Sequence, residues 1–308
     1  MTKLMLGMRG LAWTIWAAAV ASLCCGCAVR QTTVGKPSQT PLPLKAATQP
    51  ELIAQYNRLA NSVTSINASV TMQLTAGSSY SGVIEQYHEV NGFILAQKPS
   101  DIRVIGQVPI VGKNIFDMQS DGATFHIFIP SKNQFLEGSA NLERPSLKPI
   151  ENLRPQHLTD AIFWEPISQG TPVLLEEVAG PPSSLYVLTL VRTLRPNGAR
   201  QDGEGTAEDW EIARKIWFDR SDLNVVRIDT FDPAGKPAAI VRYSDWGMFE
   251  DIRYPRQILL DRPQNDYQLH LTITKLTANE PIAPDRFELP QPPGSELVRV
   301  GGGEELAP

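Results

Sequence analysis

Apolar residues at helical spacing mark the start of the predicted folded region. Thr48 and Glu51 stand at the spacing of a capping box, and Pro50 between them is tolerated in a first helical turn. The apolar positions that follow this start are Leu52, Ile53, Tyr56, Leu59, Ala60 and Val63. This spacing predicts an amphipathic helix with one buried face.

Strand-like alternation dominates the rest of the chain. Ile66 to Leu74 alternates apolar with mostly small polar residues, and Tyr267 to Thr277 is the most regular run, with alternate residues facing opposite sides. Gly92, inside an extended run, predicts a β-bulge. The other predicted strands cover 83–95, 102–104, 115–118, 125–129, 185–194, 211–218, 225–231, 238–246 and 252–260.

Helices and turns interrupt this pattern in few places. Pro155 to Trp164 predicts a helix with proline at its start, and Val173 to Val178 is interpreted as a second short helical piece. Asn197-Gly198 and Asp232 to Gly235 carry hairpin-turn chemistry. We therefore expect short antiparallel strands in a meander, with few helices between them.

The fold class follows from the need to bury the apolar face of so long a sheet. One large antiparallel sheet has to close on itself or take helices onto that face. The predicted helices are too few to form a complete second layer. We expect a mainly β protein whose sheet curls into an incomplete β-barrel with a few helices as a lid or plug, α+β in composition.

The N-terminal residues resemble a bacterial lipoprotein signal peptide. Lys3 and Arg9 precede a short apolar run from Leu11 to Leu23, too brief for a membrane-spanning helix. Gly26-Cys27 resembles a lipobox, so Cys27 is the predicted lipidation site, with an acyl chain such as palmitate as the anchor. The alternative is an ordinary signal peptide with incidental cysteines.

Four regions are expected along the chain: a signal peptide and lipidated cysteine at 1–27, a flexible tether at 28–47, a domain at 48–290 and a disordered tail at 291–308. Cleavage before Cys27 removes Lys3 and Arg9, so the formal net charge changes from -5 to -7. A mildly acidic protein is a poor partner for nucleic acid or for anionic lipid surfaces. Membrane attachment is therefore expected to be covalent.

Catalytic chemistry finds little support in the sequence. The histidines, at positions 88, 126, 157 and 270, have no partner spacing. No zinc-protease, Walker or serine-hydrolase motif occurs. We expect neither an enzyme nor a cofactor or bound metal; an envelope hydrolase is the least favoured reading.

The order of several short motifs resembles a known family. Lys98-Pro99 precedes Arg103, an apolar loop covers Val108 to Gly112, and Ser120-Asp121-Gly122 follows. The chain later carries Asn279-Glu280-Pro281-Ile282 and Phe287-Glu288-Leu289-Pro290. From about 49 to 292, this order resembles the LolA/LolB-like lipoprotein-localisation superfamily.

The resemblance implies a half-barrel whose apolar cavity receives lipid acyl chains. Sheltering hydrocarbon stabilises by about 0.8 kcal/mol per methylene, so little polar chemistry is needed. Lys98 is the candidate for the lid latch, and Ile110 with Val111 for a loop that inserts into the membrane. For each, the alternative is an ordinary role, as a solvated strand-end lysine or as a loop folded back into the barrel. The predicted cavity residues, for which ordinary core is the alternative, are Val70, Met72, Leu74, Tyr267, Leu269, Leu271 and Ile273.

Two functions fit this picture. The favoured one is a membrane-anchored, periplasm-facing lipoprotein that binds acyl chains of lipoproteins or lipids in lipoprotein sorting or insertion, together with a possible carrier protein. The other is a structural or envelope-assembly lipoprotein that binds a protein partner with the same fold. Ala28 after Cys27 lacks the acidic character of an inner-membrane retention signal, which favours the periplasmic face of the outer membrane.

Overall fold

The computed structural model describes residues 43–77, 84–140, 152–180, 184–194 and 209–300. Residues 43–308 form one compact unit. Within the described residues, no helix is long and apolar enough to cross a membrane. Cys27, the leader, most of the predicted tether and the Asn197-Gly198 turn lie outside the described residues.

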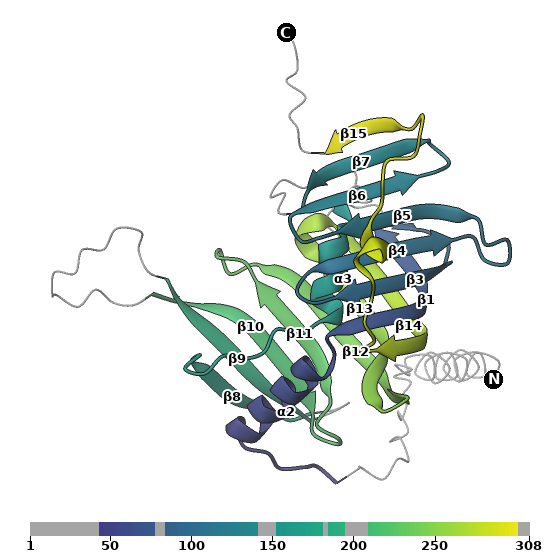
Figure 1. Ribbon diagram of the computed structural model, residues 1–308. Coiled ribbons are helices and arrows are strands. Elements are labelled where there is room, and N and C mark those ends of the chain that lie inside the picture. Colours follow the sequence, from purple (N-terminus) through teal and green to yellow (C-terminus); the bar gives the residue numbers. More distant parts are fainter. Residues whose placement is uncertain (1–42, 78–83, 141–151, 181–183, 195–208, 301–308) are drawn as a thin grey trace, which may run out of the picture. The chain divides into compact units, whose positions relative to one another are not determined.

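A single large sheet forms the body of this unit (Figure 1). Its first seven strands are β1 (Ser65–Ala76), β2 (Glu85–Gln86), β3 (Val90–Gln97), β4 (Asp101–Gln107), β5 (Asn114–Ser120), β6 (Thr124–Ile129) and β7 (Gln134–Ser139). The others are β8 (Val173–Val178), β9 (Leu185–Leu194), β10 (Asp209–Asp219), β11 (Val225–Phe231), β12 (Pro237–Phe249), β13 (Ile252–Arg262), β14 (Tyr267–Ala278) and β15 (Glu296–Val300).

The strand order is two antiparallel meanders joined in the middle. The sheet reads β15-β7-β6-β5-β4-β3-β1-β14-β13-β12-β11-β10-β9-β8, with β2 paired to β1. The join is the antiparallel pair β1 and β14, in register from Ile66 opposite Ala278 to Ala76 opposite Tyr267. The predicted mainly β, antiparallel fold is confirmed, and the sheet remains open between β15 and β8.

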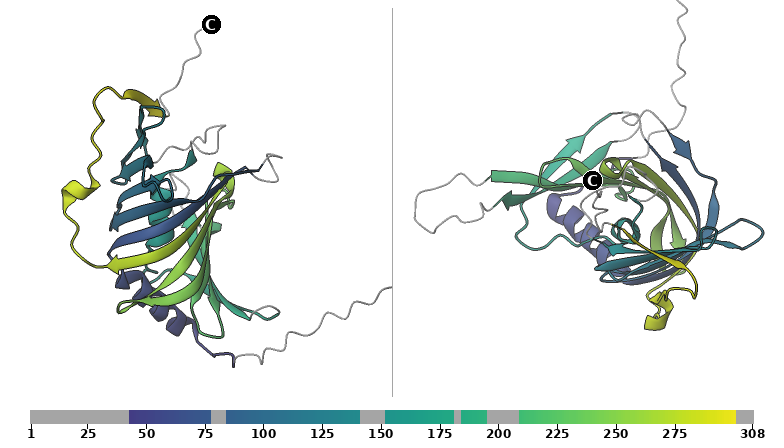
Figure 2. Two further views of the ribbon diagram at one scale, coloured as in Figure 1. Left: turned by 90° about the vertical axis from the view of Figure 1, so that its right-hand side faces the viewer. Right: turned by 90° about the horizontal axis from the view of Figure 1, so that it is seen from above.

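Two helices lie on the inner side of the curled sheet, as the view from above in Figure 2 shows. They are α2 (Gln49–Ser62) and α3 (Pro155–Ile162). The capping box that the sequence predicts is present: the Thr48 backbone N–H and hydroxyl both donate to a Glu51 carboxylate oxygen, at 2.7 and 2.8 Å. The buried face of α2 carries Leu52, Tyr56 and Ala60.

The core fills the space between the concave face and these helices. Alternate residues of each central strand point inward, as in β4, where Ile102 and Val104 are fully buried. Fully burying an aliphatic side chain stabilises by about 1.5–3 kcal/mol, so this face is the main source of stability. The helices replace the second sheet that a closed barrel would supply.

The helical interpretation of Val173–Val178 is wrong, because this segment is the edge strand β8, paired with β9 along its whole length. Six residues are too few for a stable helix, whereas an edge strand gains a full row of ladder hydrogen bonds.

The bulge predicted at Gly92 is also wrong. Gly92 pairs regularly with Val70 and Gly106, and the irregularity lies in the β1–β14 pair, where Thr274 of β14 is the extra residue opposite Ser69 and Val70. A Cβ on Gly92 would lie 2.3 Å from the Met72 methyl and 2.8 Å from the Ile105 carbonyl oxygen. Glycine is therefore required here by close packing and not by a bulge.

The tail predicted to be disordered contains ordered structure. Residues 296–300 form β15, which pairs in parallel with β7 from Glu296 opposite Gln134 to Val300 opposite Gly138. The sequence analysis missed both strands. The proline- and glycine-rich stretch before β15 carries turns, while the strand itself gains its hydrogen bonds from a partner more than 150 residues away in sequence. The turn at Asp232–Gly235 is confirmed by the Asp232 N–H to Lys236 carbonyl bond of 2.9 Å.

Candidate functional site

The candidate site is the region where the two helices meet the concave face of the sheet. Trp164, just after α3, is its centre. Its ring stacks on Tyr56 of α2 at 5.8 Å between centroids and meets Tyr243 and Trp246 of β12 edge-on at 5.1 and 5.8 Å. Such aromatic pairs add about 0.5–1.5 kcal/mol beyond their buried area.

Two buried tyrosines hold the C-terminal end of α3. The Tyr243 hydroxyl donates to the Ala161 carbonyl at 3.0 Å, and the Tyr254 hydroxyl donates to the Ile162 carbonyl at 2.8 Å. These carbonyls belong to the last helical turn, where no intrahelical donor remains. Burial raises the pKa of both tyrosines, so both stay neutral donors.

Helix α2 is held to the segment after α3 by side chains. The Asn57 amide donates to the Ile167 carbonyl at 2.9 Å and accepts from the Ile167 N–H at 2.8 Å. Arg214 of β10 donates to the Tyr56 hydroxyl at 3.1 Å and to the Glu165 backbone carbonyl at 2.7 Å, and its guanidinium pairs with the Glu165 carboxylate. The helix pair is therefore tied together and to the sheet by a few discrete contacts.

Lys98, the predicted latch, reaches the C-terminal end of α2. Its Nζ donates to the Ala60 carbonyl at 2.5 Å and lies 5.6 Å from the centroid of the Phe163 ring. Burial lowers the pKa of this lysine. The side chain thus links the β3–β4 turn to both helices, which is the geometry that a latch requires.

Asn279, the first residue of the Asn-Glu-Pro-Ile motif, fixes the same helix end from another direction. Its side chain donates to the Ser62 carbonyl at 2.8 Å and accepts from the Thr64 N–H at 2.8 Å. Its φ of 63° lies in the left-handed region that asparagine tolerates. The motif is therefore a link between the end of β14 and the α2–β1 junction.

A small pocket lies between these elements. Its volume is about 10 Å³, roughly the space of one water molecule. Its lining consists of Leu59, Ala60, Ser62, Val63, Ile162, Phe163, Trp164, Trp246, Arg253 and Tyr254. The pocket is too small for an acyl chain as it stands, so the helices are packed down in this structure.

The seven predicted cavity residues come together on the concave face. In β1 and β14, Val70 lies opposite Ile273, Met72 opposite Leu271 and Leu74 opposite Leu269. Tyr267 lies beyond them, opposite Ala76. All are buried except Leu74, which is partly buried against the same core. The structure brings the set together as packed core, and a cavity among these residues stays a prediction.

The apolar loop behaves differently from the core. Ile110 is fully exposed and Val111 is 75% exposed, in the turn between β4 and β5. Ile110 has a φ of 72°, a left-handed conformation that is a genuine outlier for a β-branched residue. Both side chains point to solvent, which is what a membrane-inserting loop requires and what stability alone disfavours.

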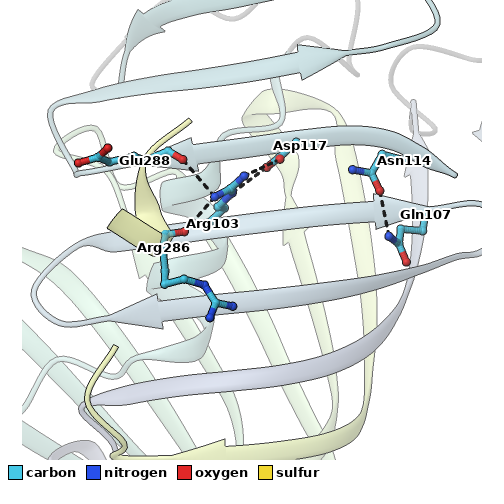
Figure 3. A network of polar contacts seen from close by, with 6 residues as sticks. All are labelled: Arg103, Gln107, Asn114, Asp117, Arg286 and Glu288. Carbon is cyan, nitrogen blue, oxygen red and sulfur yellow. Dashed lines mark hydrogen bonds and ion pairs between the residues drawn. The ribbon is translucent and has the colours of Figure 1, made fainter. Parts of the chain in front are cut away.

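Arg103 contacts the C-terminal segment and does not point to the concave face. Figure 3 shows it between Asp117 of β5 and the segment that follows β14. Its guanidinium makes a two-pronged ion pair with Asp117, at 3.1 and 2.9 Å, and donates to the carbonyls of Arg286 and Glu288 at 3.1 and 3.0 Å. The Asp117 pairing raises the pKa of Arg103. We call residues 279–295 the strap.

The histidines belong to four different parts of the fold: the segment before β3, β6, α3 and β14. His157 of α3 shares a 2.5 Å hydrogen bond with the Tyr267 hydroxyl. Burial and the charges of Arg262 and Arg154 hold the pKa of His157 well below its ordinary value. Among the described residues, no group of three or more His, Cys, Asp or Glu side chains could hold a metal ion.

Several contact residues of the site were missed by sequence reasoning. Trp164, Asn57, Tyr243 and Tyr254 act through contacts between elements far apart in the chain. The one sequence signal that pointed towards them was the presence of polar-tipped aromatic residues at buried strand positions, which require a hydrogen-bond partner.

No protein-family model and no curated protein sequence matches the chain. Among solved structures, the chain is similar to a LolA superfamily protein from Nitrosomonas europaea, with 12% identity over 79% of this chain and 99% of that one and a TM-score of 0.44. It is also similar to a DUF1329 family protein from Desulfovibrio piger, with 12% identity over 77% and 94% and a TM-score of 0.46.

A third similar structure is a domain from Vibrio parahaemolyticus assigned to outer membrane lipoprotein sorting, with 10% identity, 76% and 94% coverage and a TM-score of 0.43. The likeness is limited to the backbone arrangement. At these identities it says nothing about what the chain binds.

Proposed function

We propose that this protein binds lipid acyl chains between its concave apolar face and helices α2 and α3. The observation that carries the proposal is the closure of the site: two short helices cover a large apolar face and are held by a few side-chain hydrogen bonds. Lys98 to Ala60, Asn57 to Ile167 and the Tyr243 hydroxyl to Ala161 are such bonds. Each contributes about 1 kcal/mol, so the cover can open.

Opening would expose apolar surface to which acyl chains can bind. Each methylene transferred from water gains about 0.8 kcal/mol, so a chain of about fifteen methylenes offsets the loss of several such hydrogen bonds. The closed form in the structure, with a pocket of about 10 Å³, is then the empty state. The cargo is an acyl chain of a lipoprotein or a lipid.

The exposed loop supplies a membrane contact in this proposal. Ile110 and Val111 insert into the lipid surface while Cys27 anchors the chain, on the periplasmic face of the outer membrane. The loop and the Lys98 latch lie at opposite ends of β4, because Asp101 follows the β3–β4 turn and Gln107 precedes the loop. Seven residues of strand span about 23 Å, so cargo taken up at one end would travel beneath the helices.

The test is binding of a fluorescent acyl ester, cis-parinaric methyl ester, to residues 43–308. Ser62→Trp places a bulky ring at the rim of the pocket, and it is expected to weaken ester binding by about tenfold, or about 1.4 kcal/mol. Asn61→Trp is the matched control, because Asn61 is exposed on the same helix and does not border the pocket. Native mass spectrometry of the same fragment identifies any acyl species that copurifies.

A protein that binds no ester and copurifies with no lipid would contradict the proposal. The second candidate function, an envelope-assembly lipoprotein that binds a protein partner, would then be preferred. The tight packing of the seven predicted cavity residues favours this candidate, because a filled half-barrel can still present its outer face and edges to a partner.

A further inference from the structure

Two cationic side chains stand at the pocket without a carboxylate partner. Arg253 of β13 borders the pocket, and Lys98 donates to the carbonyl of Ala60, which borders it as well. In the part of the chain that the structure describes, neither cation has a carboxylate within ion-pair distance. Arg253 makes only a 3.3 Å hydrogen bond to the Asn224 side chain.

Some arginines of the described structure have a carboxylate partner, whereas others, such as Arg256 and Arg262, have only hydrogen bonds to a carbonyl or an amide. Those with an ion-pair partner are Arg103, Arg192, Arg214, Arg220 and Arg227. A cation next to apolar surface loses part of its hydration, and a nearby carboxylate normally compensates for that loss. Lys98 is half-buried and lacks this compensation among the described residues, whereas Arg253 is exposed and stays hydrated at the rim of the pocket.

The walls beside these cations are apolar and aromatic. Phe163, Trp164, Trp246 and Tyr254 face the pocket together with aliphatic residues of α2. Lys98 Nζ lies 5.6 Å from the Phe163 ring centroid, so its charge lies against an aromatic wall. Apolar walls with two cations at their edge, neither of them paired with a carboxylate among the described residues, match an amphiphile that has an anionic end.

We infer that the pocket binds an acyl chain with an anionic head group, a carboxylate or a phosphate, and that Lys98 and Arg253 contact that group. The inference rests on the proposed function and names the class of its ligand. The aromatic walls contact the methylenes next to the head group. Lys98 exchanges a neutral carbonyl acceptor on Ala60 for a charged one, and hydrogen bonds to charged acceptors are roughly twice as strong.

This exchange couples ligand binding to opening of the cover. In the closed form, Lys98 holds the end of α2 against the Phe163 side of the pocket. An anion that takes the Lys98 ammonium group releases the Ala60 carbonyl to solvent, and the end of α2 can then move away from α3. A ligand with a neutral end cannot compete with the Ala60 carbonyl for Lys98. Such a ligand has to displace the end of α2 through apolar contacts alone.

The experiment compares cis-parinaric acid with its methyl ester on residues 43–308 at pH 8. Wild type is expected to bind the acid about tenfold more tightly than the ester, and the double variant Lys98→Met with Arg253→Gln to bind the acid no more tightly than the ester. Lys275→Met and Arg299→Gln, both exposed and remote from the pocket lining, are the matched controls.

Lys98→Arg with Arg253→Lys keeps both charges and is expected to keep the preference, which separates charge from any loss of folding in the double variant. Equal binding of acid and ester by wild type, or a preference that survives in the double variant, would overturn the inference and leave the proposed function standing. Failure of wild type to bind either probe would overturn both.

A competition experiment tests whether the site accepts a phosphate head group as well as a carboxylate. Displacement of parinaric acid by a short-chain phosphatidic acid, but not by the corresponding diacylglycerol, extends the site to phosphate. If the diacylglycerol displaces the acid as well as the phosphatidic acid does, the head group is not recognised and the inference fails.

Discussion

At the scale of single residues, several polar groups inside the core have a defined partner. The Tyr243 and Tyr254 hydroxyls donate to carbonyls in the last turn of α3. The Asn57 side-chain amide forms hydrogen bonds with both the backbone N–H and the carbonyl of Ile167. A buried donor or acceptor that loses its partner costs about 1–3 kcal/mol. These side chains therefore determine where the helices sit, beyond what apolar packing would specify.

His157 makes stability depend on pH. Its folded-state pKa is held below that of the unfolded chain, about 6.5, so the unfolded state binds the extra proton as pH falls. The free energy of unfolding is expected to fall below pH 6.5, with a slope of at most about 1.4 kcal/mol per pH unit from this group. Denaturant titrations of wild type and His157→Gln between pH 5 and 8 measure this difference.

The variant is expected to lose this component of the slope, while His88→Gln, at an exposed position, keeps it. Parallel stability curves for wild type and His157→Gln would show that the buried histidine plays no part.

At the scale of elements, the strap leads from the central strand β14 to β15 at one edge of the sheet. After β14, the chain passes Arg103 of β4 and ends as a parallel strand on β7, as Figure 1 shows. The 3-10 turn at Pro284–Phe287 packs on β4, and Phe287 is buried. The strap thus covers one region of the outer face, and β15 covers the edge of β7, which would otherwise be open to pairing with another chain.

Arg103→Ala is expected to lower the free energy of unfolding by about 2 kcal/mol, because Asp117 is largely buried and would lose its partner. It should also speed tryptic cleavage in the strap at Arg286, since the carbonyls of Arg286 and Glu288 lose their donor. Lysine lacks the planar fork of arginine. The stability and the cleavage rate of Arg103→Lys are therefore expected to lie between those of wild type and Arg103→Ala.

Gln107→Ala is the control for this change, because Gln107 is on the same strand but bonds only to the Asn114 side chain at 2.9 Å (Figure 3). Cleavage rates that are equal in wild type and Arg103→Ala would show that other contacts hold the strap.

At the scale of the whole described unit, stability and proposed function occupy different places. The concave face and its helices hold the large buried side chains, whereas the β4–β5 loop exposes Ile110 and Val111. A strained, exposed apolar residue adds nothing to folding, so the fold carries it at a cost of roughly 1 kcal/mol or more. A position of this kind can be changed without affecting the core.

Ile110→Asn tests this separation, because asparagine tolerates the left-handed conformation and is polar. The melting temperature is expected to stay the same or rise, with a gain of up to about 1 kcal/mol, while binding of residues 43–308 to neutral phosphatidylcholine vesicles falls by about tenfold. Flotation of the vesicles measures the second quantity, and Val298→Asn on β15 is the control. Unchanged vesicle binding would assign the loop another role.

The local pattern of apolar and polar residues predicted most helices and strands. It did not predict which strands pair or which elements pack together. Thr48 and Glu51 set the start of α2, alternation marked β1 and β14, and the same alternation put the concave-face residues on one side, because all of these depend on neighbours within a few positions. Among the strands that the local pattern failed to predict, β8 is too short for the alternation of its residues to be diagnostic, and β15 has a partner that lies far away in sequence.

The amino-acid sequence by itself determined that this is a mainly antiparallel β protein with a capped helix, one apolar sheet face and an apolar turn. Only the tertiary structure decided that β1 meets β14, that Arg253 and aromatic residues after α3 and on β12 and β13 line one pocket beside the Lys98–Ala60 bond, and that Arg103 holds the strap. The reason is physical: propensity and periodicity act between near neighbours, whereas a site is made by side chains that only chain closure over many residues brings together.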